Sequence, residues 1–305
     1  VQAEKGGYRH FMLKEIHEQP RAMRDTLLGR ISLEEGEVHL EELGPAAGRL
    51  REASRVVLLA CGTSWHAALV GKFLIEHLAG LPAEVLAFDM SAACSGFVYG
   101  LISALSLCES GSGGAVIVCC VEAMSRMLDK TDRNSAPLFG DGAAAVVVEE
   151  RSTFRKHRWH AGCDGDGADL MRGAIGQGIQ LDGIRVYHRA VKLMSDTLNR
   201  LRDNDIEPTI VIGHQANSRI LQRLRDEVDI GDAIFVDRVE QFGNTSSASI
   251  PLALGTCVAE RSIPMTGRSM LVAYGSGEAW GGVSVDYDFT DLAALAVTAE
   301  GHESS

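Results

Sequence analysis

The stretch Asp89-Met90-Ser91-Ala92-Ala93-Cys94-Ser95-Gly96-Phe97 places a cysteine among small residues, where a strand is expected to turn into a helix. The apolar run from Ala83 to Phe88 predicts the strand, and Ser95 to Ser106 predicts the helix. First-turn N–H groups and the helix dipole would lower the cost of negative charge on the thiol. Because the thiolate is the nucleophilic form, this turn makes Cys94 a candidate catalytic residue.

Two distant segments carry polar residues that a reactive cysteine could use. Gly213-His214-Gln215-Ala216-Asn217 follows the expected strand Thr209 to Ile212, and Gly243-Asn244-Thr245-Ser246 lies further on. An imidazole partner favours the thiolate, so His214 is a candidate partner of the cysteine. Each residue also has an ordinary interpretation: an inert buried thiol, a hydrogen-bonded core histidine, and for Asn244 a turn former beside a glycine.

The bulk composition favours a globular protein with a sizeable core. The chain has 305 residues, 46% of them hydrophobic and 23% charged, which suits one large or two medium domains. No apolar run reaches the roughly 18 residues of a membrane span, and the start lacks an apolar signal region. The net charge of −12 argues against nucleic acid as a partner. We therefore expect neither membrane nor nucleic-acid binding.

The seven cysteines have neither disulfide-framework nor zinc-site spacing. Cys119 and Cys120 are adjacent in an apolar strand, where geometry disfavours a bond between them. A reducing, cytoplasmic compartment is the simplest expectation. We also expect no metal and no bound cofactor.

Strand–helix alternation recurs on both sides of a Gly-, Asp- and His-rich stretch at 151–182, which is expected to be mainly loop. The pattern predicts an α/β fold of two related halves. The expected divisions are a charged helical leader at 1–55, a first half with Cys94 at 56–160, a second half with His214 and Asn244 at 161–289, and a tail at 290–305.

Five strings, in family order over 87–287, resemble β-ketoacyl-acyl-carrier-protein synthase III, a condensing enzyme of the thiolase fold. The resemblance implies a thiolase-like layered fold, decarboxylative condensation in fatty acid or polyketide initiation, and a homodimer. The strings are Ala92-Ala93-Cys94-Ser95-Gly96-Phe97, Phe139-Gly140-Asp141-Gly142-Ala143, His214-Gln215-Ala216-Asn217-Ser218-Arg219, Gly243-Asn244-Thr245-Ser246 and Gly275-Ser276-Gly277.

The resemblance implies a role for each catalytic candidate. Cys94 would attack an acyl-CoA thioester and carry the acyl group, with the N–H groups of Cys94 and Gly277 as the oxyanion hole. His214 and Asn244 would hold malonyl-acyl-carrier protein through decarboxylation. This division is chemically sensible, because two donors aimed at the enolate oxygen stabilise the developing charge.

Binding residues for coenzyme A and the carrier protein are also implied. Arg133 stands where the family places an arginine near the adenine of coenzyme A. The basic stripe of Arg219 and Arg223 would help dock the acidic carrier protein, although a solvated helix face is an equally good interpretation. The remaining candidates of this set lie in the string after His214: Gln215, Ala216 and Asn217.

Residues 1–86 instead resemble the linker and first sugar-isomerase unit of glucosamine-fructose-6-phosphate aminotransferase. Thr63 and Ser64, at a helix N-terminus, would suit a sugar phosphate, against the alternative of an ordinary strand–helix turn. The rest of that enzyme has no counterpart in this sequence. The matching strings are Glu4-Lys5-Gly6-Gly7-Tyr8-Arg9-His10-Phe11-Met12, Lys14-Glu15-Ile16-His17-Glu18-Gln19-Pro20 and Leu59-Ala60-Cys61-Gly62-Thr63-Ser64-Trp65-His66.

The chain is therefore interpreted as a hybrid whose first half is incomplete or replaced at its N-terminus, with the junction near Val85 to Phe88. No clear equivalent of the family's central first strand precedes Val56, so unpaired backbone groups are expected between its neighbours. Glu278 stands where an apolar residue is usual and brings a carboxylate close to the predicted oxyanion hole. An inactive hybrid and a sugar-phosphate-binding module are the alternative functions.

Overall fold

The structure is a computed structural model that describes residues 87–290 apart from 111–114, 130, 134, 152, 175–177 and 203–206. Before residue 87 it describes only 21, 24, 30–32, 37–38, 57–60 and 77. Two compact units make up the chain, Val1–Gly48 and Arg49–Ser305. In the first unit, β1 (Ile31–Ser32) pairs antiparallel with β2 (Glu37–Val38). The candidate residues Thr63 and Ser64 lie outside the described residues.

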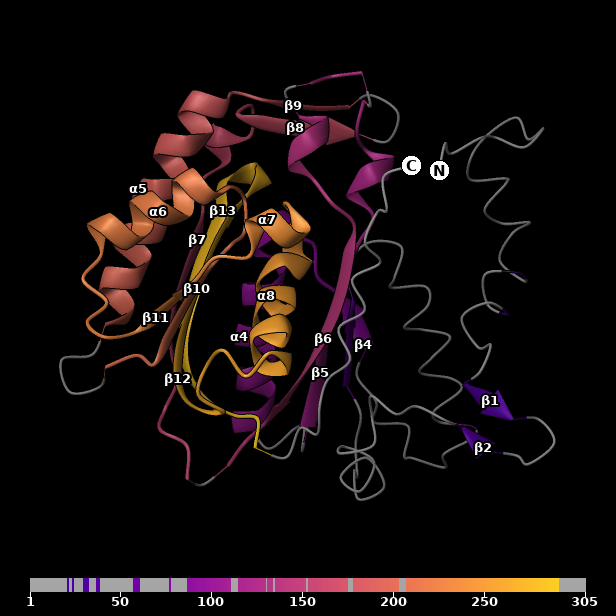
Figure 1. Ribbon diagram of the computed structural model, residues 1–305, viewed down its shortest axis with the longest axis vertical. Helices are drawn as coiled ribbons and strands as arrows, with labels where there is room; N and C mark the ends of the chain where they lie inside the picture. The colour runs from indigo at the N-terminus through magenta and orange to yellow at the C-terminus, as the bar shows by residue number, and fades with distance from the viewer. Residues whose placement is uncertain are drawn as a thin grey trace. The chain divides into compact units, whose positions relative to one another are not determined.

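A four-stranded sheet in the second unit is built from strands on both sides of Cys94 in the chain (Figure 1). Its order is β4-β3-β5-β6, with β6 antiparallel to β5. The strands are β3 (Val57–Ala60), β4 (Ala87–Asp89), β5 (Ala115–Glu122) and β6 (Gly142–Glu149).

Strand β3 occupies the central position of this sheet, for which the sequence showed no clear strand before Val56. It pairs in parallel with β4 on one side and with β5 on the other. The expectation of unpaired backbone groups between those two strands was therefore wrong. Parallel pairing uses the N–H and C=O groups on both edges of β3, which removes the predicted penalty.

The second sheet has five strands in the order β11-β10-β12-β13-β7. β10 lies parallel to β11 and β12, whereas β13 runs antiparallel to β12 and β7. The strands are β7 (Arg158–Cys163), β10 (Ile210–Gly213), β11 (Ile234–Val236), β12 (Thr266–Gly275) and β13 (Ala279–Asp288).

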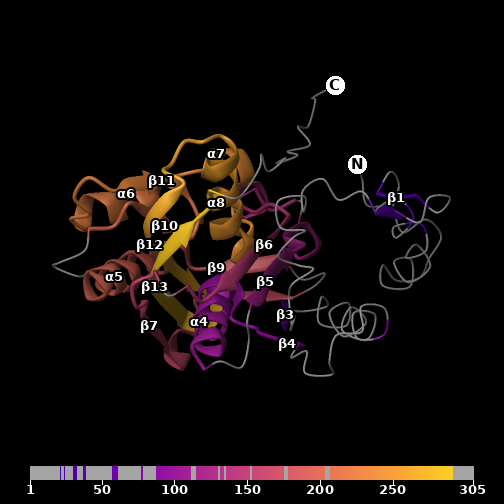
Figure 2. The same cartoon turned by 90° about the horizontal axis from the view of Figure 1, so that it is seen from below.

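Helices α4 (Gly96–Glu109) and α8 (Ser249–Ala259) form a buried layer between the two sheets (Figures 1 and 2). Both are apolar around most of their circumference, as expected for helices that are largely enclosed. Leu101 and Ile250 share a core cluster with Val116 of the first sheet and Leu271 of the second. This common core fixes the two sheets on opposite sides of the helix that follows Cys94.

The outer face of the second sheet is covered by α5 (Gly183–Leu201) and α6 (Ser218–Glu227). These helices are amphipathic: Met194, Leu198 and Leu224 pack in a second core cluster, while charged residues face outward. Alternating helix and sheet layers with a β-α unit in each half confirm the expected two-half α/β architecture. No described helix is long and apolar enough to cross a bilayer.

The segment 151–182, expected to be mainly loop, contains regular structure. Besides β7 it has the short turn η5 (Gly165–Gly167) and a hairpin of β8 (Met171–Ala174) with β9 (Gly178–Leu181). The expected division at 160/161 falls inside β7, which pairs with β13 and therefore belongs to the second half.

Candidate active site

Cys94 lies at the tight turn that was expected between strand and helix. The turn η2 (Ala93–Ser95) runs directly into α4, and Ala93 has a φ of 45°, in the left-handed region. A non-glycine residue held there is strained, and such strain concentrates at functional sites. Ser95 fixes the turn by donating its hydroxyl to the Ala279 carbonyl at 2.7 Å.

The end of β12 presses against the backbone of this turn. A Cβ built on Gly275 would lie 2.8 Å from the backbone nitrogen of Cys94 and 3.1 Å from that of Ser95. Real Cβ atoms do not approach backbone so closely, so only glycine fits. The second half of the fold thus contributes directly to the surroundings of Cys94.

The Cys94 thiol is neutral near pH 7. It is 6% exposed, and burial raises its pKa to about 11. A hydrogen bond with Ser246 and one from its own backbone N–H act in the opposite direction, while the Glu122 carboxylate raises the pKa further. The donor at the helix N-terminus therefore acts in the expected direction, but loss of water outweighs it and the thiol stays protonated.

His214 follows β10 and is also buried and neutral. Burial lowers its pKa to about 4. Its Nδ1 lies 2.7 Å from the Ser249 hydroxyl, which also accepts the Gln215 N–H at 3.3 Å. The Ser249 hydroxyl can donate its proton to Nδ1 while its oxygen accepts the Gln215 N–H, which satisfies both groups. In this arrangement His214 carries its proton on Nε2, as a hydrogen-bond donor.

Asn244 is held by the string that starts at Phe139. Its N–H donates to the Leu138 carbonyl at 2.8 Å, and its carbonyl accepts the Gly140 N–H at 3.0 Å. The side-chain Oδ1 accepts the Ser246 N–H at 2.9 Å. That bond orients the amide and leaves its NH₂ group as the donor end.

Two serines connect the three catalytic candidates. Ser246 bonds to both Cys94 and Asn244, and Ser249, three residues later, bonds to His214. His214 also donates its N–H to Val272 of β12, the strand whose last residue touches Cys94. The elements that carry the predicted catalytic residues therefore meet at one place.

Gly277 and Glu278 form the turn η7 (Ser276–Glu278), which contacts η2. Gly277 has a φ of 75° and Glu278 a φ of 49°. The Glu278 carboxylate is 1% exposed and pairs with Arg189 of α5. Arg189 also bonds Asp164 at 2.9 Å. The sequence places a carboxylate close to the predicted oxyanion hole but gives no sign of its partners Arg189 and Asp164.

The residues that follow His214 form hydrogen bonds within the protein. Gln215 is buried, donates to the Gly213 carbonyl at 2.6 Å and accepts the Arg238 N–H at 2.7 Å. Asn217 caps α6 by accepting the Ile220 N–H at 3.0 Å. Ala216 donates its N–H to the His214 carbonyl at 2.8 Å. These bonds shape the backbone after His214 and occupy the polar side chains that were candidates for ligand binding.

The basic candidates are on the surface. Arg133 is exposed in a turn after η3 (Met124–Arg126). Arg219 and Arg223 lie exposed on α6, where Arg223 pairs with Glu227 at 2.8 Å.

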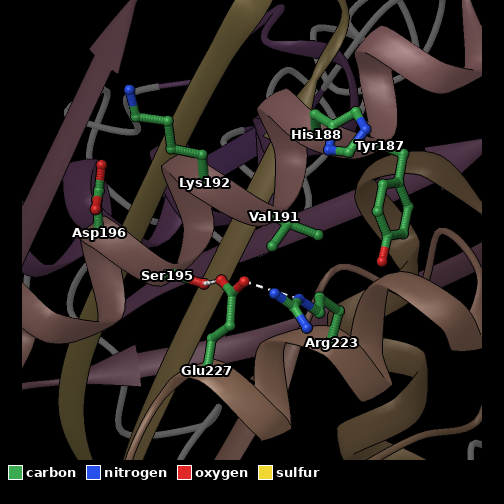
Figure 3. A pocket seen from close by; sticks show the side chains of 8 residues that line it. All are labelled: Tyr187, His188, Val191, Lys192, Ser195, Asp196, Arg223 and Glu227. Atoms are coloured by element: carbon green, nitrogen blue, oxygen red, sulfur yellow. Dashed lines mark hydrogen bonds and ion pairs between the residues drawn. The ribbon is translucent and has the colours of Figure 1, made fainter.

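A cavity of about 600 Å³ lies beside Arg223, between α5 and α6 (Figure 3). Ser195, on α5, donates at 3.0 Å to Glu227, the carboxylate that also pairs with Arg223. The cavity is distinct from the surroundings of Cys94, and its charged groups carry both signs. Its lining residues are Tyr187, His188, Val191, Lys192, Ser195, Asp196, Arg223 and Glu227. Nowhere among the residues that the structure describes does a group of three or more His, Cys, Asp or Glu side chains form a possible metal site.

The layered fold and the buried thiol grouped with a histidine and an asparagine define a thiolase-fold protein with a cysteine-based site. Two family models match the chain: the 3-oxoacyl-[acyl-carrier-protein] synthase III model at residues 88–167 and its C-terminal model at 198–287. The first matched segment carries the string around Cys94, and the second carries the strings around His214 and Asn244.

Similar proteins agree with that class. A synthase III from Halalkalibacterium halodurans is 34% identical over 248 residues, covering 79% of this chain and 78% of the relative. One from Pseudomonas aeruginosa is 36% identical over 220 residues but covers 66% of each chain. The chain belongs to the β-ketoacyl-[acyl-carrier-protein] synthase III family.

Solved structures carry the same fold. The Pseudomonas aeruginosa PAO1 synthase III has a TM-score of 0.67 at 31% identity, covering 81% of this chain and 80% of that one. The priming β-ketosynthase of the R1128 polyketide pathway has a TM-score of 0.68 at 28% identity, covering 80% and 76%.

Proposed function

We propose that this protein is an acyltransferase that condenses an acyl-CoA primer with malonyl-acyl-carrier protein, with loss of CO₂. The observation that carries the proposal is the meeting of Cys94, His214 and Asn244 through Ser246 and Ser249. Family membership supports it, since the relatives bear the name of this activity.

In the first step, the Cys94 sulfur attacks the acyl carbonyl carbon and coenzyme A leaves as its thiol. The thiol proton must depart for this step, because burial holds the pKa of Cys94 at about 11. The N–H groups of Cys94 and Gly277 would stabilise the oxyanion. Fixed donors are effective here because they need no reorganisation as charge develops.

In the second step, the malonyl group loses CO₂ and the electron pair of that C–C bond forms an enolate. Neutral His214, with its proton on Nε2, and the Asn244 amide would donate to the enolate oxygen. The enolate carbon then attacks the acyl–Cys94 thioester, and the Cys94 sulfur leaves. Two neutral donors suit this step, because neither holds a proton acidic enough to quench the carbanion readily.

Mass spectrometry tests the proposal directly. Incubation with acetyl-CoA should add one acetyl group to Cys94, and later addition of malonyl-acyl-carrier protein should remove it as β-ketoacyl product. The Cys94→Ala variant should acquire no adduct. A folded wild-type protein that forms no adduct with acetyl-CoA or longer acyl-CoA primers would refute the proposal.

The partners follow from the same proposal. The exposed pair Arg219 and Arg223 would receive the acidic carrier protein, Arg133 would contact coenzyme A, and the active form would be a homodimer. Attraction between surface charges weakens with salt, so KM for the carrier protein should rise with ionic strength. A cytoplasmic location fits the six described cysteines, which are all free thiols.

We also infer that residues 1–86 derive from an aminotransferase-like segment. The support is the resemblance of its sequence strings, together with the start of the family match at Phe88, beside the expected junction. Aminotransferase activity and sugar-phosphate binding are not favoured. Titration with glucosamine 6-phosphate should therefore give no heat of binding.

A further inference from the structure

The carboxylate of Glu278 is an unusual group to find next to a buried thiol. It is 1% exposed and follows Gly277, the proposed oxyanion-hole residue. Nε and one terminal nitrogen of Arg189 bond its two oxygens, which gives a bidentate ion pair. Such forked pairs fix geometry as well as charge.

A second set of bonds ties this pair to η5. Arg189 also donates to Asp164 Oδ2 at 2.9 Å, and the Asp164 N–H donates to the Glu278 carbonyl at 3.2 Å. Asp164 Oδ1 in turn accepts the Asp166 N–H at 3.1 Å within η5. One guanidinium on α5 therefore holds the turns η5 and η7 together.

The Glu278 side chain passes tightly beneath η5. A Cβ on Gly167 would overlap the Oε2 atom of its carboxylate. From the other side, the Tyr274 hydroxyl donates to Oε1 at 3.3 Å. Burial raises the pKa of the Tyr274 hydroxyl, and the Glu278 carboxylate raises it further. The carboxylate is thus enclosed between η5 and the Tyr274 side chain.

The backbone of η7 requires such support. Gly277 and Glu278 both have left-handed φ values, which is unfavourable for glutamate. Backbone strain of this kind persists only where the surrounding structure imposes it. The ion pair with Arg189 and the carbonyl bond from Asp164 are the contacts that impose it here.

We propose that Arg189 and Glu278 are positioning residues: their ion pair holds the turn at Gly277 and Glu278 against η2, so that the acyl oxygen meets correctly placed donors. The inference rests on the proposed acyl transfer to Cys94. It concerns the arrangement of the oxyanion turn and not the reactivity of the thiol itself.

The opposite charges of Arg189 and Glu278 predict different effects for single and double substitutions. Removing Arg189 alone leaves a buried carboxylate without its partner, which must take up a proton or turn outward and so displace η7. Removing both charges leaves no such demand, so the double change should be less damaging than the single one. This non-additivity is expected only if the two residues act as a pair.

Two reactions of Cys94 separate positioning from a general structural effect. In acetylation by p-nitrophenyl acetate, the sulfur attacks the carbonyl, nitrophenolate leaves and the oxyanion needs its donors. In alkylation by iodoacetamide, the sulfur displaces iodide and no oxyanion forms. Both reactions release the thiol proton to solvent and can be followed on the full chain with the same variants.

We expect Arg189→Met to slow acetylation by about tenfold, less than the roughly 10²–10³-fold loss seen when an oxyanion donor itself is removed. Alkylation should change by less than about threefold. Arg189→Met/Glu278→Met should recover much of the lost acetylation rate, and Arg189→Lys should fall between. Arg202→Gln, which removes an exposed ion pair with Asp229 at 3.3 Å, is the matched control and should leave both rates unchanged.

The outcomes are separable. Equal losses in both reactions, with a lower melting temperature and no recovery in the double variant, would mean that the pair only stabilises the fold and would overturn the proposal. Normal acetylation in Arg189→Met would also overturn it. A wild-type protein that is alkylated but never acetylated would refute the proposed function itself.

Discussion

Cys94 and His214 are kept uncharged by the same cause, burial without a strong counter-charge. In this state the two groups are not a charged pair, although the sequence makes His214 a candidate partner of the Cys94 thiol. His214 instead serves as a donor whose tautomer is set by Ser249. The site favours reactions in which charge develops on the substrate oxygen and is met by neutral donors.

The pH dependence of Cys94 alkylation follows from its raised pKa. With a pKa of about 11, the thiolate fraction rises about tenfold per pH unit between pH 7 and 9, and so should the iodoacetamide rate. N-acetylcysteine, measured in parallel, should level off near the ordinary thiol pKa of about 8.5. A protein rate that is flat above pH 7 would contradict the buried, neutral thiol.

His214 should make folding stability depend on pH in acid. Its pKa is about 4 in the folded protein and about 6.5 unfolded, so between these values the unfolded chain binds more protons. Stability contributed by neutral His214 is present above pH 6.5 and is lost as pH falls toward 4. The loss amounts to about 3 kcal/mol at most, at about 1.4 kcal/mol per pH unit.

Urea unfolding of wild type and His214→Gln at several pH values measures this contribution. The variant cannot take up the proton, so its stability should fall less steeply between pH 6.5 and 4. Parallel curves for the two proteins would show that His214 does not carry the depressed pKa.

Ser249→Ala tests the tautomer of His214. Without the hydroxyl, Nδ1 loses its 2.7 Å partner and the proton is no longer confined to Nε2. We expect decarboxylation of the malonyl group to slow about tenfold, with acetylation of Cys94 unchanged; this is less than the roughly 10²–10⁴-fold contribution of a positioned proton donor, because His214 itself remains. Ser106→Ala, on the exposed face of α4, is the control. Equal loss of both half-reactions would argue against a role specific to His214.

Among the elements, those with local signals were predicted well and those without were not. α6 has clear local signals in the sequence, because Asn217 caps it and its apolar positions repeat with helical spacing. β7 was missed because its residues are half-buried or exposed and lack a clear alternation. The Arg189–Glu278–Asp164 network has no local pattern at all, since its members come from three separate elements.

Two glycines, one at the end of β12 and one inside α8, provide a paired prediction. Gly275→Ala places a Cβ 2.8 Å from the Cys94 nitrogen and should cost about 1–3 kcal/mol, with slower acetylation. Gly255→Ala, inside α8, meets nothing within 4 Å and should stabilise by about 0.5–1 kcal/mol. Thermal melts and p-nitrophenyl acetate bursts on both variants check this. Similar behaviour of the two would contradict the close approach of β12 to η2.

At the scale of the whole molecule, the sequence predicted the two-half architecture but not how the first sheet is completed. Motif strings identify the family and the residues around Cys94, whereas strand order depends on pairing between distant segments. The residues of β3 pair with partners far along the chain: Leu58 pairs with Ala87, 29 residues later, and Val57 pairs with Val116, 59 residues later. Nothing local in the sequence reveals that choice.

The position of β3 predicts how far the chain can be shortened. Removing 1–48 takes away one compact unit and leaves β3 in place, so a cooperative melt and acetylation of Cys94 should both survive. Removing 1–86 also deletes β3, so the facing edges of β4 and β5 lose their ladder, and each buried unpaired group costs about 1–3 kcal/mol. Circular dichroism melts and acetyl-adduct mass spectrometry on both truncations compare the outcomes. If the chain beginning at Ala87 still melts cooperatively and is acetylated like wild type, then β3 is dispensable, and the aminotransferase-like segment does not complete the sheet that frames Cys94.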